Sequence, residues 1–278
     1  MPLVQQITPQ VLQWITAQAR AGHTPEAVLE AMRARGWHDA TATSAVEKAK
    51  QGGLTGELPP VPVPDPDPSD SQVILRTADR EVSVLMSLRR PRVAVFGNLL
   101  SEAECEQLME LARPRLQRSL TVDNWSGGSQ LSDARSSEGA FFQRGEHITL
   151  QCLEARIASL VKWPVNHGEG LQILRYGPAA EYQPHHDYFD PSIPGSPRTL
   201  ANGGQRVATL IIYLKAPQRG GATIFPEIGL RVAPVRGNAV FFSYNRPHPS
   251  TRTLHGGAPV IAGEKWIATK WLREGVFV

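Results

Sequence analysis

Residues 59–68 read PPVPVPDPDP and contain six prolines in ten positions, which limits the fold more than any other part of the chain. Each proline lacks a backbone N–H and has a fixed φ angle, so this stretch can form neither a helix nor a central strand. It favours an extended polyproline II conformation, about 30 Å of semi-rigid spacer. We therefore predict a linker over residues 53–74, between a short segment 1–52 and a longer segment 75–278. The alternative interpretation is a proline-rich ligand for another domain.

The segment 1–52 is predicted to form a module of three short helices. Thr8 and Thr24 each precede a proline and can cap a helix, and Asp39 can cap a third. Apolar residues follow at helical spacing, and glycines end the first two runs. The pattern indicates no catalytic chemistry, so two roles stay open for the module. It could dock a protein partner, or it could be a structural appendage.

The composition argues against several classes of protein. No run of about 18 apolar residues occurs, so we expect no membrane-spanning helix and no membrane partner. Two cysteines, Cys105 and Cys152, are too few for a disulfide framework or a cysteine-rich zinc site. The opening MPLVQQITPQ lacks the basic and apolar regions of a secretory signal, so we expect a cytoplasmic location. A net charge of +3 is too weak to indicate a nucleic-acid partner.

Beyond the linker the predicted secondary structure changes from helix to strand. Ser101 and Glu104 form a capping box for a helix to about Ala112, and a second helix is expected over 147–161. Short runs rich in β-branched and aromatic residues then alternate with Gly/Pro turns. The expected strands are 93–96, 171–176, 206–214, 223–225, 239–244 and 266–272. This pattern predicts a mainly β, α+β fold of the jelly-roll type, with helices on one outer face.

The motif EYQPHHDYFD offers ligands for a metal ion. On an extended strand, His185 and Asp187 point to one face and His186 to the other. One imidazole and one carboxylate suit a divalent first-row metal, whose facial triad then needs a second histidine. The candidates are His248, between two prolines in a loop, and His255, in the run TLHGG just before an expected strand. The neighbouring strand favours His255.

Lys265 follows His255 by ten positions and begins an apolar strand. A lysine that points into a barrel is costly to bury without a counter-charge, and a dicarboxylate co-substrate would supply one. Thr209, inside RVATLIIYL, could donate a hydrogen bond to the same carboxylate, and Arg206 is a weaker alternative cation. Otherwise Lys265 is an exposed strand-end lysine and Thr209 an ordinary β-former.

These motifs together resemble the prolyl 4-hydroxylase family of iron(II)/2-oxoglutarate dioxygenases. The resemblance rests on HHD, TLHGGAPV and the Lys-Trp pair, with LQILRYGPAAEYQPHHDYFD, RVATLIIYL, GGATIFPE and GEKWIATKWLRE in support, over roughly residues 90–274. It implies a double-stranded β-helix domain that uses Fe(II), 2-oxoglutarate and O₂, and it allows ascorbate as a reductant. It also implies hydroxylation of a prolyl residue, at its 4-position, in a peptide or protein, with succinate and CO₂ as co-products.

The resemblance also implies roles for single residues. The implied ligands are His185, Asp187 and His255 for iron, and Lys265, Tyr176 and Thr209 for 2-oxoglutarate. The run SDARSSEG, residues 132–139, resembles the family's mobile loop over a peptide groove. Arg135 in this run is therefore a candidate for substrate contact, and Glu169 and Tyr244 are weaker candidates.

Other functions stay open at this point. The same oxygenase chemistry could act on a free amino acid or on a side chain other than proline, because loops determine the substrate. A metal-binding sensor or scaffold without turnover would use the same barrel. Nucleic-acid demethylation would share the iron centre, but it calls for a basic, aromatic-lined face that the composition does not favour.

Overall fold

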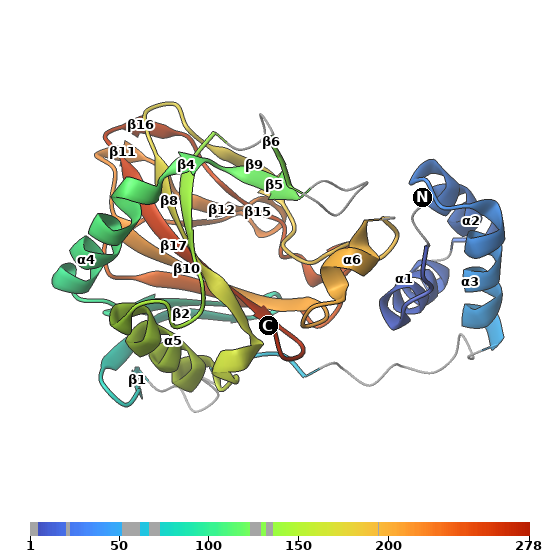
Figure 1. The fold of residues 1–278 in the computed structure, drawn as a ribbon, viewed down its shortest axis with the longest axis horizontal. Coiled ribbons are helices and arrows are strands. Elements are labelled where there is room, and N and C mark those ends of the chain that lie inside the picture. Colours follow the sequence, from blue (N-terminus) through green and yellow to red (C-terminus); the bar gives the residue numbers. More distant parts are fainter. Residues whose placement is uncertain are drawn as a thin grey trace.

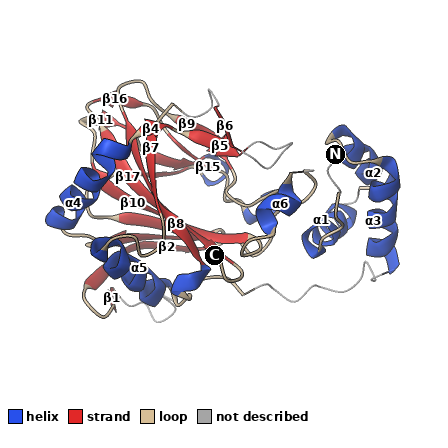
Figure 2. Ribbon diagram, in the orientation of Figure 1, coloured by secondary structure: helices blue, strands red, loops and turns tan. Residues whose placement is uncertain are grey.

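The computed structural model describes residues 5–20, 23–51, 62–66, 73–122, 129–131, 136–193 and 195–278. Three helices come first, and a body of antiparallel strands with three further helices follows the proline-rich stretch (Figure 1, Figure 2). Across these ranges, no helix has the length and apolar character needed to cross a lipid bilayer.

The N-terminal helices form where the caps and prolines predict them. They are α1 (Pro9–Arg20), α2 (Pro25–Ala34) and α3 (Asp39–Gln51). The hydroxyl of Thr24 accepts a hydrogen bond from a first-turn amide at 3.3 Å and so caps α2. Asp39 does not cap α3 as predicted. The first helical hydrogen bond, from the amide of Ala42 to the carbonyl of His38 at 2.9 Å, places the cap one residue earlier, at His38. Asp39 instead lies in the first turn of α3 and forms a salt bridge with Arg33.

The described part of the proline-rich stretch, residues 62–66, lies against the strand-rich body. The amide of Asp65 donates to the carbonyl of Val161 at 3.0 Å, and the Asp65 carboxylate forms an ion pair with Arg92. The prolines on either side of Asp65 are buried. This part of the stretch therefore follows the surface of the body, which a free spacer would not do.

A nine-stranded sheet forms the larger half of the body, and all its neighbouring strands pair in the antiparallel sense. In spatial order its strands are β1 (Ile74–Arg76), β2 (Glu81–Arg89), β3 (Arg92–Gly97), β14 (Ala239–Ser243), β10 (Arg206–Lys215), β17 (Lys265–Arg273), β8 (Gly168–Tyr176), β7 (Glu138–Phe142) and β4 (Gln117–Arg118). Side chains of the central strand β10 alternate between the two faces. Leu210 and Leu214 pack on the outer face, whereas Ile211 and Tyr213 pack on the inner face.

A smaller four-stranded sheet faces the inner side of the larger one. Its strands, in order, are β13 (Leu230–Val232), β12 (Thr223–Phe225), β15 (His255–Gly257) and β9 (Tyr182–His185). Two short pairs complete the described strands: β11 (Arg219–Gly220) with β16 (Val260–Ala262), and β5 (Leu120–Val122) with β6 (Ser129–Leu131). Tyr213, Phe225 and Phe242 from the two sheets fill the space between them. The arrangement confirms the predicted mainly β, jelly-roll fold.

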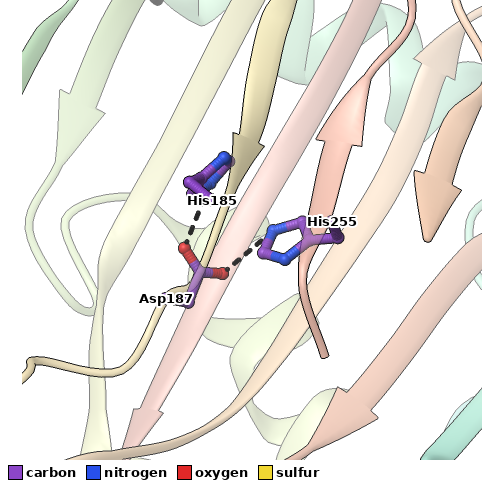
Figure 3. Close-up of side chains that lie close together, drawn as sticks. All are labelled: His185, Asp187 and His255. Atoms are coloured by element: carbon purple, nitrogen blue, oxygen red, sulfur yellow. Dashed lines mark ion pairs between the residues drawn. The ribbon is translucent and has the colours of Figure 1, made fainter. Parts of the chain in front are cut away.

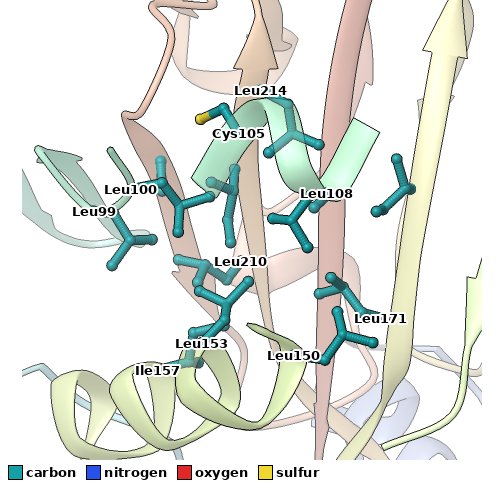
Figure 4. Packing of buried hydrophobic residues seen from close by; sticks show 14 of the residues in the cluster. Leu99, Leu100, Cys105, Leu108, Leu150, Leu153, Ile157, Leu171, Leu210 and Leu214 are labelled. Carbon is teal, nitrogen blue, oxygen red and sulfur yellow. The ribbon is translucent and has the colours of Figure 1, made fainter. Parts of the chain in front are cut away.

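The helices that follow the linker are α4 (Glu102–Ala112), α5 (Ile148–Val161) and α6 (Ser196–Leu200). The first two cover the outer face of the larger sheet, and α4 begins at the predicted capping box of Ser101 and Glu104. Figure 4 shows Leu108 of α4 and Leu150 of α5 with Leu171 of β8 in one cluster. Burial of such a side chain stabilises the fold by about 1.5–3 kcal/mol. The large sheet is thereby held rigid behind the strands that carry the site.

Candidate metal centre and co-substrate pocket

Two neighbouring strands of the smaller sheet carry the candidate metal ligands. His185 ends β9 and His255 begins β15, and the two residues lie opposite each other in the antiparallel register. Asp187 lies two residues after His185, in the bend that follows β9, and its side chain meets those of the two histidines. Figure 3 shows its carboxylate between the two imidazole rings, with one oxygen toward each. His248, the alternative histidine, instead caps a short 3₁₀ helix over residues 249–251.

The three donor groups converge on one point. Nε2 of His185 lies 3.5 Å from Oδ1 of Asp187, and Nε2 of His255 lies 3.4 Å from Oδ2. One ligand atom from each residue falls within 4.8 Å of the other two. Three ligands held at about 2.1 Å from a metal ion, at right angles, would lie about 3.0 Å apart. The donor atoms are spaced more widely than this, and small movements of the side chains would bring them to a facial site for a divalent ion.

Backbone carbonyls determine which nitrogen each histidine presents. Nδ1 of His185 lies 2.9 Å from the carbonyl oxygen of Gln183, and Nδ1 of His255 lies 3.0 Å from that of Thr253. A carbonyl oxygen only accepts, so each Nδ1 carries the hydrogen and each Nε2 keeps its lone pair. Both lone pairs face the carboxylate of Asp187.

Burial and charge set the protonation states. Burial lowers the pKa of His255 to about 4, so this imidazole is neutral at pH 7. Burial alone would raise the pKa of Asp187, but nearby positive charge, including the guanidinium of Arg206, holds it below its ordinary value. Two lone pairs and a carboxylate in close contact repel one another unless a cation lies between them. The donor set therefore fits a divalent metal such as iron(II).

Two hydroxyl groups support Asp187 from behind. Oγ1 of Thr209 donates to Oδ2 of Asp187 at 2.7 Å. Because that hydroxyl hydrogen is engaged, the phenol of Tyr244 donates to Oγ1 of Thr209 at 3.0 Å. Arg206 adds a hydrogen bond from Nη1 to the backbone carbonyl of Asp187 at 3.5 Å. Such support orients a ligand and tunes its basicity.

The ligands open onto a pocket that also holds Lys265. Its side chain is 2 % exposed, and Nζ donates to the carbonyl of Gly221 at 3.0 Å and lies 4.5 Å from the ring centre of Tyr176. In the described part of the chain no carboxylate pairs with this ammonium group. Burial lowers the pKa of Lys265 to about 8. The pocket thus holds a buried cation whose charge no described residue of its wall neutralises.

Glycines leave space around this lysine. A Cβ atom at Gly257 would lie 3.3 Å from Nζ of Lys265, and one at Gly221 would lie 3.2 Å from its Cδ. Gly221 also has a φ of +71°, which side chains rarely adopt. Larger residues at these positions would crowd the lysine and narrow the pocket around Nζ.

The structure engages three of the residues expected at the co-substrate or the peptide in contacts within the protein. Thr209 uses its hydroxyl on a candidate metal ligand and is not part of the wall around the lysine. Glu169 is buried in ion pairs with Arg206 at 2.6 Å and Arg273 at 2.7 Å, so it cannot contact a peptide. Tyr244 is also buried, and its hydroxyl is hydrogen-bonded. Arg206, the alternative cation, is engaged in its ion pair with Glu169 and does not line the pocket. The remaining candidate for substrate contact, Arg135, lies outside the described residues.

One strand contributes pocket residues that the sequence pattern did not single out. Lys265, Ile267, Thr269 and Trp271 of β17 all line the pocket. They recur every second residue, so the two-residue period that starts at Lys265 could have identified them. The indole N–H of Trp271 is buried with no acceptor among the described residues, and the guanidinium of Arg206 lies 4.1 Å from its ring centre.

Known protein families and relatives match the part of the chain that forms this pocket. Residues 171–273, which include both histidines, the aspartate and the lysine, match the model of the 2OG-Fe(II) oxygenase superfamily. The chain is 42% identical over 201 residues to prolyl 4-hydroxylase 1 of Arabidopsis thaliana, across 66% of this chain and 69% of that protein. It is 39% identical over 208 residues to prolyl 4-hydroxylase 5 of the same plant, across 67% and 70%.

A solved structure extends the likeness to the fold. The viral collagen prolyl hydroxylase of Paramecium bursaria Chlorella virus-1, determined as a complex with 2-oxoglutarate, superposes with a TM-score of 0.51 and 29% sequence identity. The match covers 65% of this chain and 95% of the viral one. The identity to the plant enzymes and the superfamily match together show that this chain belongs to the prolyl 4-hydroxylase family of 2-oxoglutarate- and iron(II)-dependent oxygenases.

Proposed function

We propose that this enzyme hydroxylates prolyl residues of a peptide or protein, with iron(II) held by His185, Asp187 and His255. The observation that carries the proposal is the shared pocket, in which this triad and the un-neutralised ammonium of Lys265 line one cavity. A triad alone would suit many metal sites, and a buried lysine alone would suit many anions. Their combination suits a metal together with a dicarboxylate co-substrate.

Lys265 would bind the distal carboxylate of 2-oxoglutarate. A bound anion would favour the charged ammonium and so reverse the lowering of its pKa by burial. Tyr176, whose ring lies beside Nζ, would form the wall next to that carboxylate. Iron(II) with 2-oxoglutarate and O₂ supplies the oxidising chemistry, in which the co-substrate yields succinate and CO₂ and one oxygen atom enters a substrate C–H bond.

The protein's own residues would exclude water from the metal site and hold the metal ligands in place. The rings of Phe242 and Phe225 lie 4.4 Å and 5.9 Å from the ring of His255, between centroids, and shield this ligand from water. Thr209 and Tyr244 hold the Asp187 carboxylate in place through their hydroxyl groups. The active-site groups are therefore fixed before substrate arrives, which is what positioning requires.

The similarity to plant enzymes supports a prolyl peptide as the substrate. The plant relatives at 42% and 39% identity are prolyl 4-hydroxylases by name, which favours the 4-position. A free amino acid or a non-prolyl side chain would keep the same oxygenase chemistry.

Mass spectrometry of a cell lysate tests the substrate. The lysate is incubated with the enzyme, Fe(II), 2-oxoglutarate and ascorbate, the reductant we expect, and peptides are searched for +16 Da. We expect new +16 Da modifications on proline that vanish when 2-oxoglutarate is omitted and when Asp187→Ala replaces the wild type. Modifications confined to other residues would contradict the prolyl assignment and leave the oxygenase assignment intact.

A further inference from the structure

The N-terminal helices contact the segment that leads away from the candidate metal ligand Asp187. Trp37, in the turn between α2 and α3, is 4 % exposed and packs in the core of the three helices. Its indole N–H donates to the backbone carbonyl of Ser192, a residue with no exposed surface. The ring thus belongs to one core while its polar atom is bonded to another part of the fold.

Several hydrogen bonds hold the segment around Ser192 in its conformation. Its amide and hydroxyl both donate to Oδ1 of Asp190, at 2.8 Å and 2.6 Å. The amide of Phe189 donates to the side-chain oxygen of Gln205 at 2.8 Å, and the amide nitrogen of that glutamine donates back to the carbonyl of Phe189 at 2.8 Å. These bonds tie Ser192 to Asp190 and tie the next residue back along the chain, Phe189, to Gln205.

Phe189 connects the segment to the pocket. The guanidinium of Arg206 lies 4.8 Å from the ring centre of Phe189 and 4.1 Å from that of Trp271, so it packs against both rings. Trp271 lines the pocket. A continuous set of contacts thus runs from Trp37 through Ser192, Phe189 and Arg206 to the wall of the site.

Two polar contacts fix the helices at further points. The side-chain amide of Gln18 in α1 lies 3.4 Å from Nε2 of His248, in the loop that precedes the ligand His255; Nδ1 of His248 accepts from the amide of Ser250, so Nε2 carries the hydrogen and donates to this side-chain amide. Nε2 of Gln10, also in α1, donates to Oε1 of Glu274 at 3.0 Å, directly after β17. The helices therefore contact the chain next to β15 and β17 as well as the segment after Asp187, and Figure 1 shows them on the α6 side of the barrel.

We propose that Trp37 is a positioning residue of this oxygenase, and that through Ser192 it makes the N-terminal helical unit a structural part of the substrate side of the site. Loss of the indole N–H would loosen the segment around Ser192 and shift the ring of Phe189, which packs with Arg206 beside Trp271. It would not disturb Lys265, which begins β17 and lies six residues before Trp271 on that strand. In a variant without this N–H we expect weaker peptide binding and unchanged binding of the co-substrate.

The test compares Trp37→Phe with Trp14→Phe in the full chain. Both tryptophans are buried in the same helical core, and Trp14 packs under the guanidinium of Arg35. Hydrogen–deuterium exchange reports on the amides of Ile193 and Ser196, which are bonded within the segment. We expect about tenfold faster exchange there in Trp37→Phe, and wild-type rates in Trp14→Phe. Wild-type rates in Trp37→Phe, or equal acceleration in both variants, would overturn the proposal.

A kinetic comparison of the same variants rests on the proposed function, because it needs turnover of a proline peptide. The hydrogen–deuterium exchange measurement needs no turnover. For Trp37→Phe the KM for a proline peptide should rise several-fold, while the KM for the co-substrate stays constant. A parallel rise of both constants would refute the positioning role. If no proline peptide is turned over even by the wild type, the proposed function fails and the exchange result still decides on Trp37.

Gln18→Leu gives a second test that leaves the core of the helices intact. We expect faster exchange at the amides of Ser250 and Thr251, which bond to His248. Unchanged exchange at both amides would show that the helices do not hold this loop, and would count against the proposal even if Trp37→Phe failed to fold.

Discussion

Thr209 donates a hydrogen bond of 2.7 Å from its hydroxyl to Oδ2 of Asp187, the oxygen that faces His255. The threonine lies in β10 of the larger sheet, and the aspartate follows β9 of the smaller one. This bond therefore links the two sheets of the barrel at the point where the metal ligands meet. It also makes the carboxylate depend on the rigid core behind β10.

Replacement of Thr209 by valine should weaken metal binding by about 10- to 100-fold, because the carboxylate loses the donor that orients it. Titration with Mn(II), which avoids oxidation, measures the affinity. Thr209→Ser keeps the hydroxyl and serves as the control, with near wild-type affinity. Equal affinity in the valine variant and the wild type would show that the bond does not support a metal site.

Lys265→Met should raise the KM for the co-substrate 2-oxoglutarate by about 30- to 100-fold, because a charge-assisted hydrogen bond to its carboxylate is lost. The rate at saturating co-substrate should fall much less. Lys215→Met is the matched control and should leave this KM unchanged. Lys215 lies at the C-terminal end of β10, and its half-exposed side chain pairs with Glu264. An unchanged KM in Lys265→Met would remove the lysine from its proposed role.

The affinity for 2-oxoglutarate should fall as pH rises through about 8. Burial lowers the pKa of Lys265 to about 8 in the free protein, so above that pH the free side chain is mostly neutral and binding must take up a proton. Well above this pKa, the affinity should drop about tenfold per pH unit. Calorimetric titration between pH 7 and pH 10 measures it. Lys265→Arg stays charged and should remove the dependence; the same slope in that variant would assign it to another group.

The buried ion pair of Lys270 and Glu154 should have a large effect on stability. Their side chains are both 2 % exposed, and Nζ donates to Oε1 at 2.5 Å. Glu154→Ala should lower the free energy of unfolding by about 3–5 kcal/mol, because it leaves a buried ammonium without a partner. The double variant Glu154→Leu/Lys270→Met should recover most of that loss in urea unfolding. A loss in the double variant as large as in Glu154→Ala would mean that packing, and not the unpaired charge, causes it.

Local patterns in the sequence were enough to predict the fold class. The capping box of Ser101 and Glu104, the threonines before the helical prolines, and the alternation in RVATLIIYL each follow from neighbouring residues, and each is found in the structure. The close approach of His185 and Asp187 was predicted from the two-residue period of a strand, although β9 ends at His185 and Asp187 lies in the bend that follows. Short elements such as α6 were missed, because five residues give too little periodicity to detect.

Relationships that depend on sheet register could not be predicted. Thr209 reaches Asp187 because β10 and β9 belong to facing sheets, a fact that the spacing of 22 residues does not contain. The burial of Glu169 between two arginines arises from the order of β8, β17 and β10 in the large sheet. The contact of Trp37 with Ser192 joins residues 155 positions apart. These contacts arise from tertiary structure, and the propensities of neighbouring residues do not predict them.

The most direct test of the account is the Asp187→Ala variant, measured for both bound iron and succinate release. Anaerobic loading should give one Fe(II) per chain in the wild type, and a proline-containing peptide should release one succinate for each hydroxyproline formed. In Asp187→Ala we expect loss of bound iron and no peptide-dependent succinate, with the fold unchanged by circular dichroism. Near wild-type iron loading together with wild-type succinate release in that variant would contradict the assignment of His185, Asp187 and His255 as the metal site.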